Sequence, residues 1–263
     1  MNQDLELALE LAEIADEISL ARFKNQDFKV ETKPDSTPVT ESDRAVEKAI
    51  KHKLSQTRPT DSIIGEEFGT EGVNLHGPGS RTWIIDPIDG TANYMRQVPI
   101  WATLIALSID GKPTVSVVSA PALGRRWWAC PEDGSWTREI DGTTRKLAVS
   151  KISDLEHASM SYVSLKLWEQ LGKTDQLMNI VGRVWRTRAF GDFWSYMLLA
   201  EGAIDFTCEH GLEIYDWAAL VPIVEQAGGR ITSYHQELNP KSSAVLASNG
   251  LLHPQILEFF PED

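Results

Sequence analysis

The chain has 263 residues, of which 25 are Lys or Arg and 38 are Asp or Glu, so its formal net charge is −13. This acidic balance argues against nucleic acid as the main ligand, because binding to a phosphate backbone depends on clustered cations. The two cysteines, Cys130 and Cys208, are too few for a disulfide framework and fit a reducing cytoplasm. The acid-rich N-terminus lacks the basic start of a secretory signal, and no run approaches the roughly 20 apolar residues of a membrane span. We therefore expect a cytoplasmic protein without a membrane partner.

The N-terminal part predicts two helices. In the first, apolar residues recur at helical spacing, at Leu7, Leu11, Ile14 and Ile18. A loop punctuated by proline follows at residues 33–38, and the TESD motif at residues 40–43 is a capping box that predicts the start of the second helix. The inward face of that helix is predicted at Ala45, Val46, Ala49, Ile50 and Leu54. Capping is therefore one role open to Asp43.

Two short apolar strands are predicted to end at acidic residues. The first covers residues 62–65 and leads through a glycine into Glu66. The second covers residues 83–85 and ends at Asp86, where a proline fixes φ and turns the chain. Asp86 and Asp89 are then expected to face the same pocket.

The turn after these acids suits an anion. Gly90 lets the backbone approach a ligand, and successive N–H groups of Gly90 and Thr91 form a small anion-binding nest. Mg²⁺ prefers carboxylate, carbonyl and water oxygens, and a substrate phosphate can replace its waters. The segment predicts a place where metal and phosphate meet; an ordinary surface turn rich in Asp, Pro and Gly is the alternative.

The remaining chain predicts alternating strands and helices. The Asp110-Gly111 turn within residues 100–119 predicts a hairpin. Further strands are predicted at residues 127–129, 147–149, 160–163 and 203–208, and further helices at residues 174–181, 192–201 and 216–227. We expect Pro222 to kink the last helix or tighten its early turns. Trp127 and Trp128 are placed on the sheet surface or at a subunit contact, with substrate stacking as the alternative.

These elements fit an α+β layered architecture, with neither a Gly-rich dinucleotide loop nor a P-loop. Several motifs then resemble a known family: KPD at residues 33–35, VTESD at 39–43, GEE at 65–67, DPIDGT at 86–91, and Asp216 followed by the glycine pair at 228–229. Together they resemble the inositol monophosphatase-like family of metal-dependent sugar and polyol phosphatases, over nearly the whole chain. The resemblance implies a layered α/β/α/β/α sandwich. Residues 1–148 would form an N-terminal α+β half with most metal ligands, and residues 149–263 a C-terminal α/β half that completes the site in one compact unit.

The resemblance also implies the residues of the site. The metal ligands are Glu66, Asp86, Asp89, Asp216 and the carbonyl of Ile88, for two or three Mg²⁺ ions. The substrate is bound by the amides of Gly90 and Thr91, together with Asp89 and Asp216. The catalytic residues are Glu66, Thr91 and Asp43, and the last two orient the attacking water. Glu67 is expected to support the ligands or to be solvated, and Asp216 has helix-dipole stabilisation as its alternative role. A homodimer is implied in the same way.

The choice of substrate depends on residues 186–194. Many polyol phosphatases of this family have small or hydroxyl-bearing residues after the glycine here, whereas this chain has Asp192 followed by two aromatic residues. A carboxylate with aromatic faces suits a cationic, partly planar group, and the stretch resembles the histidinol-phosphate phosphatase branch of the family. Glu209 matches a family position that contacts the organic part of the substrate, and Arg188 is assigned to the phosphate or to ordering this loop. The alternative is that Asp192 caps its helix while both aromatic residues pack in the core.

The resemblance therefore predicts Mg²⁺-dependent hydrolysis of a small phosphate ester, histidinol phosphate, in histidine biosynthesis. Lys33 is a weaker candidate for the site, on the entry loop. An inositol monophosphatase or a broad sugar phosphatase is the alternative enzyme. The alternative of another class is a regulatory binding partner of transcription machinery, against which the intact set of acids counts.

Overall fold

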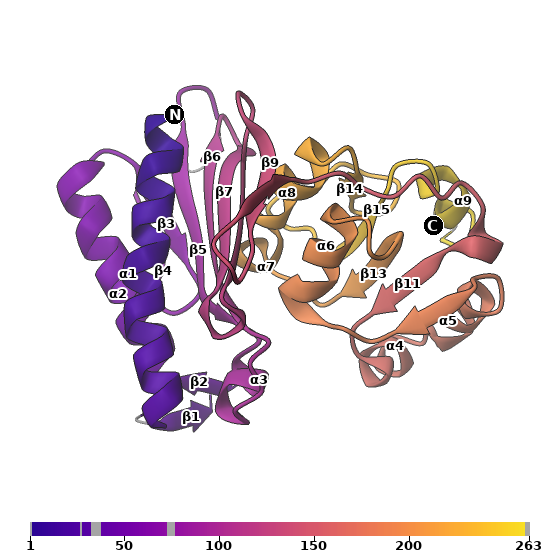
Figure 1. Cartoon of the computed structure of the whole chain (residues 1–263), viewed down its shortest axis with the longest axis horizontal. Coiled ribbons are helices and arrows are strands. Elements are labelled where there is room, and N and C mark those ends of the chain that lie inside the picture. Colours follow the sequence, from indigo (N-terminus) through magenta and orange to yellow (C-terminus); the bar gives the residue numbers. More distant parts are fainter. Residues whose placement is uncertain (1, 27, 33–37, 73–76, 261–263) are drawn as a thin grey trace.

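The computed structural model describes residues 2–26, 28–32, 38–72 and 77–260, so Lys33 and the rest of the motif at residues 33–35 lie outside the described residues. An eight-stranded sheet and a five-stranded sheet alternate with layers of helices, which Figure 1 shows from left to right. The predicted α+β class and the layered α/β/α/β/α sandwich are confirmed.

The first helical layer consists of α1 (Gln3–Asn25) and α2 (Glu41–Thr57). Both pack on one face of the larger sheet (Figure 1). In α1, Leu7 and Leu11 are buried as predicted, but Ile14 and Ile18 are only half-buried. The rest of the buried face of α1 consists largely of alanines such as Ala12, because their small side chains let the helix lie close to the sheet.

The capping box at the start of α2 is confirmed. The N–H of Thr40 donates to Asp43 Oδ2 at 2.9 Å, and the N–H of Ser42 donates to Thr40 Oγ1 at 3.1 Å. On the predicted inward face, Val46, Ile50 and Leu54 are buried, whereas Ala45 and Ala49 are half-buried. A fully buried acid, Glu47, shares this face.

The larger sheet has the strand order β10 (Thr144–Lys146), β9 (Gly134–Arg138), β8 (Arg125–Cys130), β7 (Lys112–Ala120), β6 (Ala102–Ile109), β5 (Arg81–Asp89), β3 (Ser62–Gly65) and β4 (Gly69–Glu71). The predicted hairpin joins β6 to β7, with positive φ at both Asp110 and Gly111. The predicted end of β5 at Asp86 is wrong, because the strand continues to Asp89. Its register shifts between these two residues, where Pro87 has no N–H to donate to the ladder.

The middle layer consists of α6 (Asp192–Ala200), α7 (Ile214–Trp217) and α8 (Leu220–Gln226). Its apolar side chains pack with the larger sheet on one side and the smaller sheet on the other. The predicted single helix from Asp216 is instead two short helices, the first of which begins before Asp216. Pro222 has no N–H with which to bond the carbonyl of Ala218, where the helix is interrupted.

The smaller sheet has the strand order β12 (Arg186–Arg188), β11 (Ser159–Tyr162), β13 (Phe206–His210), β15 (Ala244–Ser248) and β14 (Arg230–Thr232). Its outer face is covered by α4 (Leu165–Gln170), α5 (Thr174–Val181) and α9 (His253–Leu257). The other elements are β1 (Val30–Thr32), β2 (Pro38–Thr40), α3 (Thr91–Met95), and the 3₁₀ turns η1 (Pro121–Leu123) and η2 (Leu155–His157). The strand predicted at residues 203–208 begins later, because the N–H groups of Ala203 and Ile204 bond back to Leu198 in α6.

Two further predictions for the larger sheet are wrong. Residues 147–149 form no strand, because the N–H of Leu147 donates to β9 and that of Val149 donates to the carbonyl after α8. The segment therefore crosses between layers. Trp127 is not at the surface but fully buried against Phe193, while Trp128 is half-buried on the opposite face of the sheet.

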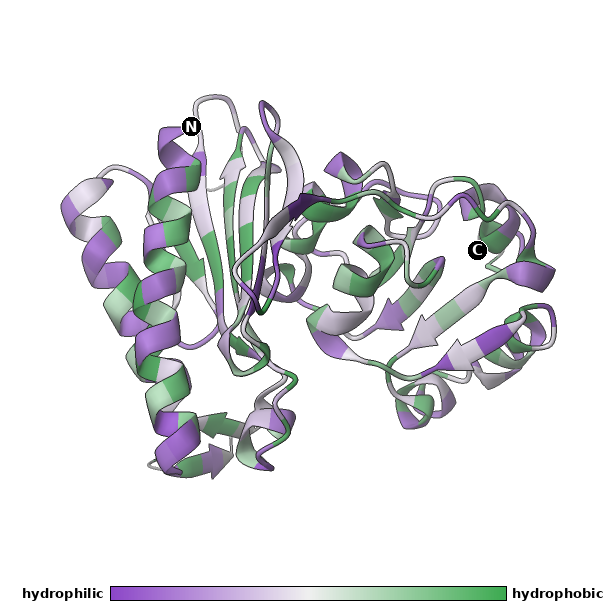
Figure 2. Ribbon diagram, viewed as in Figure 1, coloured by the Kyte–Doolittle hydropathy of each residue, from purple (hydrophilic) through white to green (hydrophobic). Residues whose placement is uncertain are grey.

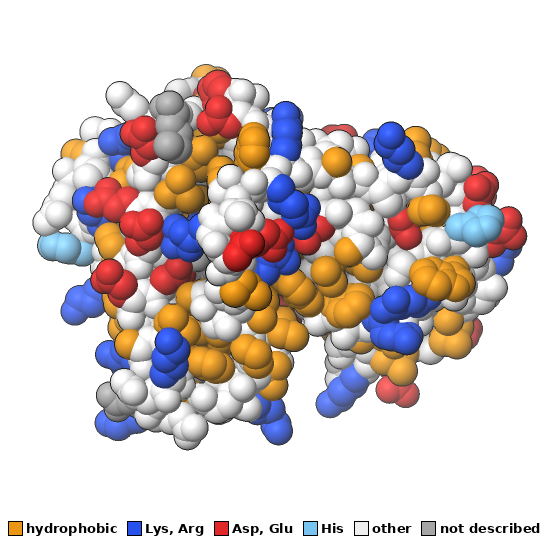
Figure 3. Space-filling view, viewed as in Figure 1, with side chains coloured by type: hydrophobic (Ala, Val, Ile, Leu, Met, Phe, Trp, Pro, Cys, Tyr) orange, Lys and Arg blue, Asp and Glu red, His pale blue; other side chains and the backbone are white. Residues whose placement is uncertain are grey.

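The distribution of polarity agrees with this layering. Figure 2 shows green, hydrophobic stretches along the strands of the larger sheet and alternating green and purple on α1 and α2. On the face in Figure 3, basic and acidic side chains are interspersed. In the described part of the chain, no helix has both the length and the apolar character that crossing a membrane requires.

Candidate active site

The candidate site lies at the end of the parallel pairing between the neighbouring strands β3 and β5. Gly65 pairs with Ile85, and the N–H of Glu66 extends this ladder by donating to the carbonyl of Ile85 at 3.2 Å. Glu66 and Asp86 are therefore the next residues on these two neighbouring strands after the last pair. The sequence predicted both segments but did not show that they are parallel neighbours.

Three predicted metal ligands converge beside this edge. Oxygen atoms of Asp86, Asp89 and Asp216 lie within 4.8 Å of one another. In a regular strand, residues three apart face opposite sides, so the register shift in β5 is what brings Asp86 and Asp89 to the same side. Each carboxylate is oriented by one backbone N–H: Ile88 donates to Asp86 at 3.0 Å, Phe193 to Asp89 at 2.7 Å and Glu213 to Asp216 at 2.7 Å.

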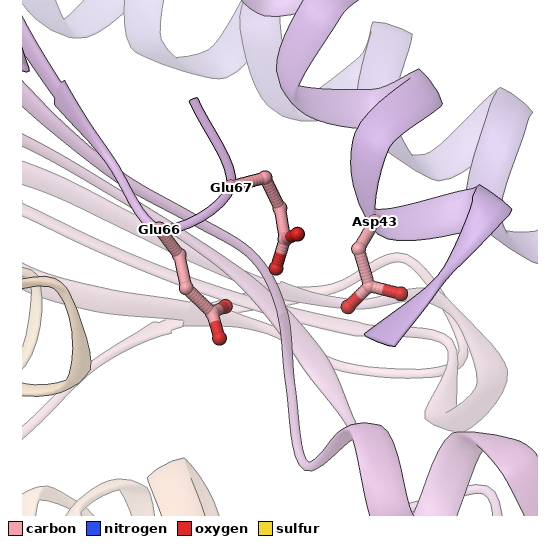
Figure 4. A group of neighbouring side chains, drawn as sticks. All are labelled: Asp43, Glu66 and Glu67. Carbon is pink, nitrogen blue, oxygen red and sulfur yellow. The ribbon is translucent and has the colours of Figure 1, made fainter. Parts of the chain in front are cut away.

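A second acidic group contains Asp43, Glu66 and Glu67, again with oxygen atoms within 4.8 Å of one another. In the view of Figure 4, the carboxylate of Glu67 lies between those of Glu66 and Asp43. The sequence predicts a supporting or solvated place for Glu67, and the structure puts its carboxylate inside the group. Glu66 connects the two groups, since its charge acts on the buried Asp86.

Asp43 has two contacts at once. Its Oδ2 accepts the capping hydrogen bond from Thr40, and its Oδ1 lies 3.3 Å from the hydroxyl of Thr91. That hydroxyl also lies 3.0 Å from the carbonyl of Ile88, and its single hydrogen serves one acceptor at a time. Burial raises the pKa of Asp43 to about 6, although the hydrogen bonds from Thr40 oppose the shift. Capping and contact with Thr91 therefore coexist.

Two adjoining cavities share Asp89, Asp192 and Asp216 in their walls. The main cavity, of about 240 Å³, is lined by Glu66, Asp86, Ile88, Asp89, Gly90, Thr91, Ala92, Asp192 and Asp216. The side cavity, of about 180 Å³, is lined by Asp89, Asp192, Phe193, Tyr196, Glu209, Leu212, Asp216 and Leu220. Six carboxylates occur in these walls and, among the described residues that line them, no Lys, Arg or His. These acids stay ionised where a cation pairs with them, and otherwise burial favours their protonated form.

Three carboxyl groups of the main cavity, those of Asp86, Asp89 and Asp216, have a raised pKa. Burial, and then the charges of Glu66, Asp89 and Asp216, raise the pKa of Asp86 well above its usual range. Burial and the charges of Asp192 and Asp216 do the same to the pKa of Asp89. Burial raises the pKa of Asp216 to about 7, although the N–H of its capping partner opposes the shift. A bound cation would compete with these protons and lower each pKa.

The turn after β5 lies at the edge of the main cavity. Gly90 has a φ of 83°, and a Cβ there would lie 3.1 Å from the carbonyl of Ile100 and 3.3 Å from Asp192 Oδ2. Both the conformation and the close contacts therefore favour glycine. The N–H groups of Thr91 and Ala92 belong to the first turn of α3 and have no acceptor within that helix. The turn thus brings backbone donors next to the carboxylates.

Asp192 lies in the walls of both cavities. It begins α6 with a φ of 48°, which is uncommon for a residue with a side chain. The cap of α6 is Gly191, and Asp192 Oδ2 instead accepts a hydrogen bond from Asn93 Nδ2 at 3.2 Å. The interpretation of Asp192 as only a helix cap is therefore wrong. Burial raises its pKa.

The side cavity is lined by further residues that were predicted to contact the substrate. Glu209 is buried, and its Oε2 accepts a hydrogen bond from the hydroxyl of Tyr196 at 2.9 Å. Burial raises the pKa of Glu209, although this hydrogen bond opposes the shift. Phe193 lines the same cavity, whereas Trp194 packs against Trp127. Of the two aromatic residues, only Phe193 lines a cavity, and its side chain is also buried in the core against Trp127, as the alternative interpretation expected.

Arg188 is not brought to the carboxylates. It is exposed on β12, and its guanidinium donates to the carbonyl of Thr187 at 2.7 Å. It does not occur among the described residues that line either cavity. Its role at the phosphate or in ordering the loop stays a prediction.

Residues 1–262 match the model of the inositol monophosphatase family. The chain belongs to this family. It is 49% identical over 260 residues to the histidinol-phosphatase of Streptomyces coelicolor, with 97% of this chain and 96% of that protein covered. It is 46% identical over 256 residues to the histidinol-phosphatase of Mycobacterium tuberculosis, with 97% of each covered. A solved IMPase structure from Thermotoga maritima has a TM-score of 0.84 and 26% identity, with 98% of this chain and 96% of that chain covered.

Three residues of this family member support the site although the sequence analysis did not single them out. Tyr196 holds Glu209, Asn93 holds Asp192, and Glu47 contacts the turn after β3. Helical spacing carried a signal for two of them, because Tyr196 lies one turn after Asp192 and Glu47 lies one turn after Asp43. Asn93 and Asp192 are 99 residues apart, and nothing local connects them.

Proposed function

We propose that this protein is a Mg²⁺-dependent phosphatase that hydrolyses histidinol phosphate to histidinol and phosphate in histidine biosynthesis. The observation that carries the proposal is the pair of carboxylates, Asp192 and Glu209, in a cavity that adjoins the group formed by Asp86, Asp89 and Asp216. Similarity to histidinol-phosphatases over nearly the full length supports the same activity.

The residues of the main cavity fit divalent cations, because their side chains offer oxygen atoms that would otherwise remain as crowded, buried acids. We propose that two or three Mg²⁺ ions are held by Glu66, Asp86, Asp89, Asp216 and the carbonyl of Ile88. Such ions, when bound, activate a water and neutralise phosphoryl oxygens. The protein must then orient the ester and the water.

The turn after β5 and the start of α2 would provide that orientation. The amides of Gly90 and Thr91 bind phosphoryl oxygens, as backbone N–H groups at such turns do. The hydroxyl of Thr91, which lies 3.3 Å from Asp43 Oδ1, would orient the attacking water together with Glu66, which lines the same cavity. Asp43 can hold a proton in the neutral range because burial raises its pKa to about 6. The oxygen of the water bonds to phosphorus as the P–O bond to histidinol breaks, and the alcohol oxygen takes up a proton that balances the one the water gives up.

Recognition of the organic group would rest on charge. Histidinol phosphate carries an amine and an imidazole, and both can be cationic. Among the described residues, neither Asp192 nor Glu209 forms an ion pair with Lys or Arg, so both are available to a cationic substrate. A polyol phosphate offers no positive charge to these acids.

Asp192→Ala tests this recognition. We expect kcat/KM for histidinol phosphate to fall about 10- to 100-fold through a higher KM, because a charge-assisted contact contributes roughly 1.5 to 3 kcal/mol. Hydrolysis of glycerol phosphate, which has no cationic group, should change little. The measurement is kcat/KM for both esters with wild type and variant. Asp175→Ala, which removes an exposed acid from the first turn of α5, is the matched control and should affect neither ester.

Similar losses on both esters in Asp192→Ala would contradict a recognition role. An inositol or broad sugar phosphatase would use the same main cavity. Unlike a histidinol-phosphatase, it would need no charge at Asp192 and Glu209 to bind its substrate. A purely regulatory partner of transcription machinery would not need the converging acids of the main cavity.

Three further features are also proposals. The halves 1–148 and 149–263 would form one unit with the site between them, as the carboxylates of β5 and α7 suggest. A homodimer follows from the family resemblance. A cytoplasmic location agrees with Cys130 and Cys208, which are both free thiols.

A further inference from the structure

Glu47 is a buried acid that the proposed mechanism does not use. Its side chain is fully covered, on α2. Its Oε2 accepts the N–H of Glu67 at 2.7 Å, and its Oε1 accepts the N–H of Phe68 at 3.1 Å. A carboxylate is costly to bury unless its oxygens are hydrogen-bonded. Here both oxygens bond to the turn that also carries Glu66.

The contact between Glu47 and this turn is close enough to require glycine at position 65. A Cβ on Gly65 would lie 1.9 Å from Glu47 Oε1 and 2.3 Å from its Cδ. Gly65 is not among the residues with positive φ, so its backbone conformation is open to other residues. The glycine is therefore needed for space, and the space is filled by the Glu47 carboxylate.

One face of α2 thus holds two segments of the site. Asp43 and Glu47 are one helical turn apart and project from the same face. Asp43 reaches Thr91 at the start of α3, and Glu47 reaches the turn after β3. That turn joins β3 to the antiparallel β4, where Gly65 pairs with Gly69, and the carboxylate of Glu47 holds the backbone of two of its residues.

We propose that Glu47 is the positioning residue of the metal site. It holds the turn after β3 so that Glu66 and Glu67 face the other carboxylates (Figure 4). This inference rests on the proposed role of Glu66 as a metal ligand. Residues that orient metal ligands from behind typically change metal affinity by about 10- to 100-fold when they are removed.

The test is the dissociation constant of Mn²⁺, measured by calorimetry without substrate for wild type, Glu47→Ala and Glu47→Gln. We expect Mn²⁺ to bind about 10- to 100-fold more weakly to Glu47→Ala, with a smaller loss in Glu47→Gln, which keeps one acceptor oxygen. Asp205→Asn is the matched control. The buried carboxylate of Asp205 also accepts a backbone N–H, from Ser159 at 2.6 Å, so this variant should lose stability but keep its Mn²⁺ affinity.

Gly65→Ala provides a second, independent variant. Its methyl group should displace the Glu47 carboxylate and weaken Mn²⁺ binding about as much as Glu47→Ala does. In the Glu47→Ala background, Gly65→Ala should weaken Mn²⁺ binding little further, because the carboxylate with which its methyl group would clash is gone. If Glu47→Ala does not fold, Glu47→Gln and Gly65→Ala decide the question in the same way.

Wild-type Mn²⁺ affinity in folded Glu47→Ala, or additive losses in the double variant, would overturn the proposal. A wild-type protein that binds no Mn²⁺ would refute the metal site itself, and the inference with it. The two failures are therefore distinguishable by the wild-type measurement alone.

Discussion

Asp86→Asn should leave less than about 1% of the wild-type phosphatase activity, because losing one group that stabilises charge in a transition state costs on the order of 10²- to 10³-fold. Asp86 is buried at the end of the β3–β5 ladder, within 4.8 Å of oxygens of Asp89 and Asp216. Asparagine keeps the shape and removes the charge that a cation needs. The measurement is phosphate release from histidinol phosphate across a range of Mg²⁺ concentrations.

The same variant should remain folded. Burial and neighbouring acids raise the pKa of Asp86 above its unfolded value, so ionisation of Asp86 destabilises the fold as the pH rises above that unfolded value. A neutral Asn removes this loss. In a chelator at neutral pH, the Tm of Asp86→Asn should therefore equal or exceed that of wild type. If Asp86→Asn kept wild-type turnover at limiting Mg²⁺, the metal assignment would be refuted. If its Tm were lowered, the loss of activity would result from misfolding.

Thr91→Val should lower kcat by about 100-fold or more, the scale of a positioned proton-transfer group. Valine keeps the shape of the side chain but removes the hydroxyl that lies near Asp43 and the carbonyl of Ile88. The Tm should stay nearly unchanged, because Asp43 still caps α2 through Thr40. Single-substrate kinetics together with thermal unfolding of the variant check both expectations.

Thr137→Val is the matched control for this prediction. Thr137 is a buried threonine whose hydroxyl donates to the carbonyl of Arg126 at 3.2 Å, on β9 and away from the carboxylates. It should lose stability while its kcat stays near that of wild type. Parallel losses of stability and kcat in Thr91→Val would instead mean that Asp43 and Thr91 serve only the start of the helix.

The parts of the fold that depend on neighbours along the chain could be predicted from the sequence. The capping box at Thr40, the strand β3, the hairpin at Asp110 and the helix α5 follow from residues that contact one another locally. The family motifs also placed the acids of β5 and α7, which the structure brings together. A resemblance was needed for that step, because a motif predicts which residues are special but not their distances.

The rest depends on packing between distant segments. The sequence predicts Trp127 on the sheet surface or at a subunit contact, but α6 of the middle layer covers it. No motif marks Glu47, but its buried carboxylate accepts the N–H groups of the turn after β3. The contact between Asn93 and Asp192 crosses the two halves of the chain. Local patterns mark some of these residues but do not predict which distant segment each of them contacts.

The most direct test of the proposed activity is the wild-type kcat/KM for histidinol phosphate and for inositol 1-phosphate, each measured with Mg²⁺ and with a chelator. The charges of Asp192 and Glu209 predict a preference for histidinol phosphate of at least about tenfold, the low end expected for a charge-assisted contact. The carboxylates of the main cavity predict that the chelator abolishes both activities. Equal or faster turnover of inositol phosphate, or turnover of histidinol phosphate that survives complete removal of divalent metal, would contradict the account.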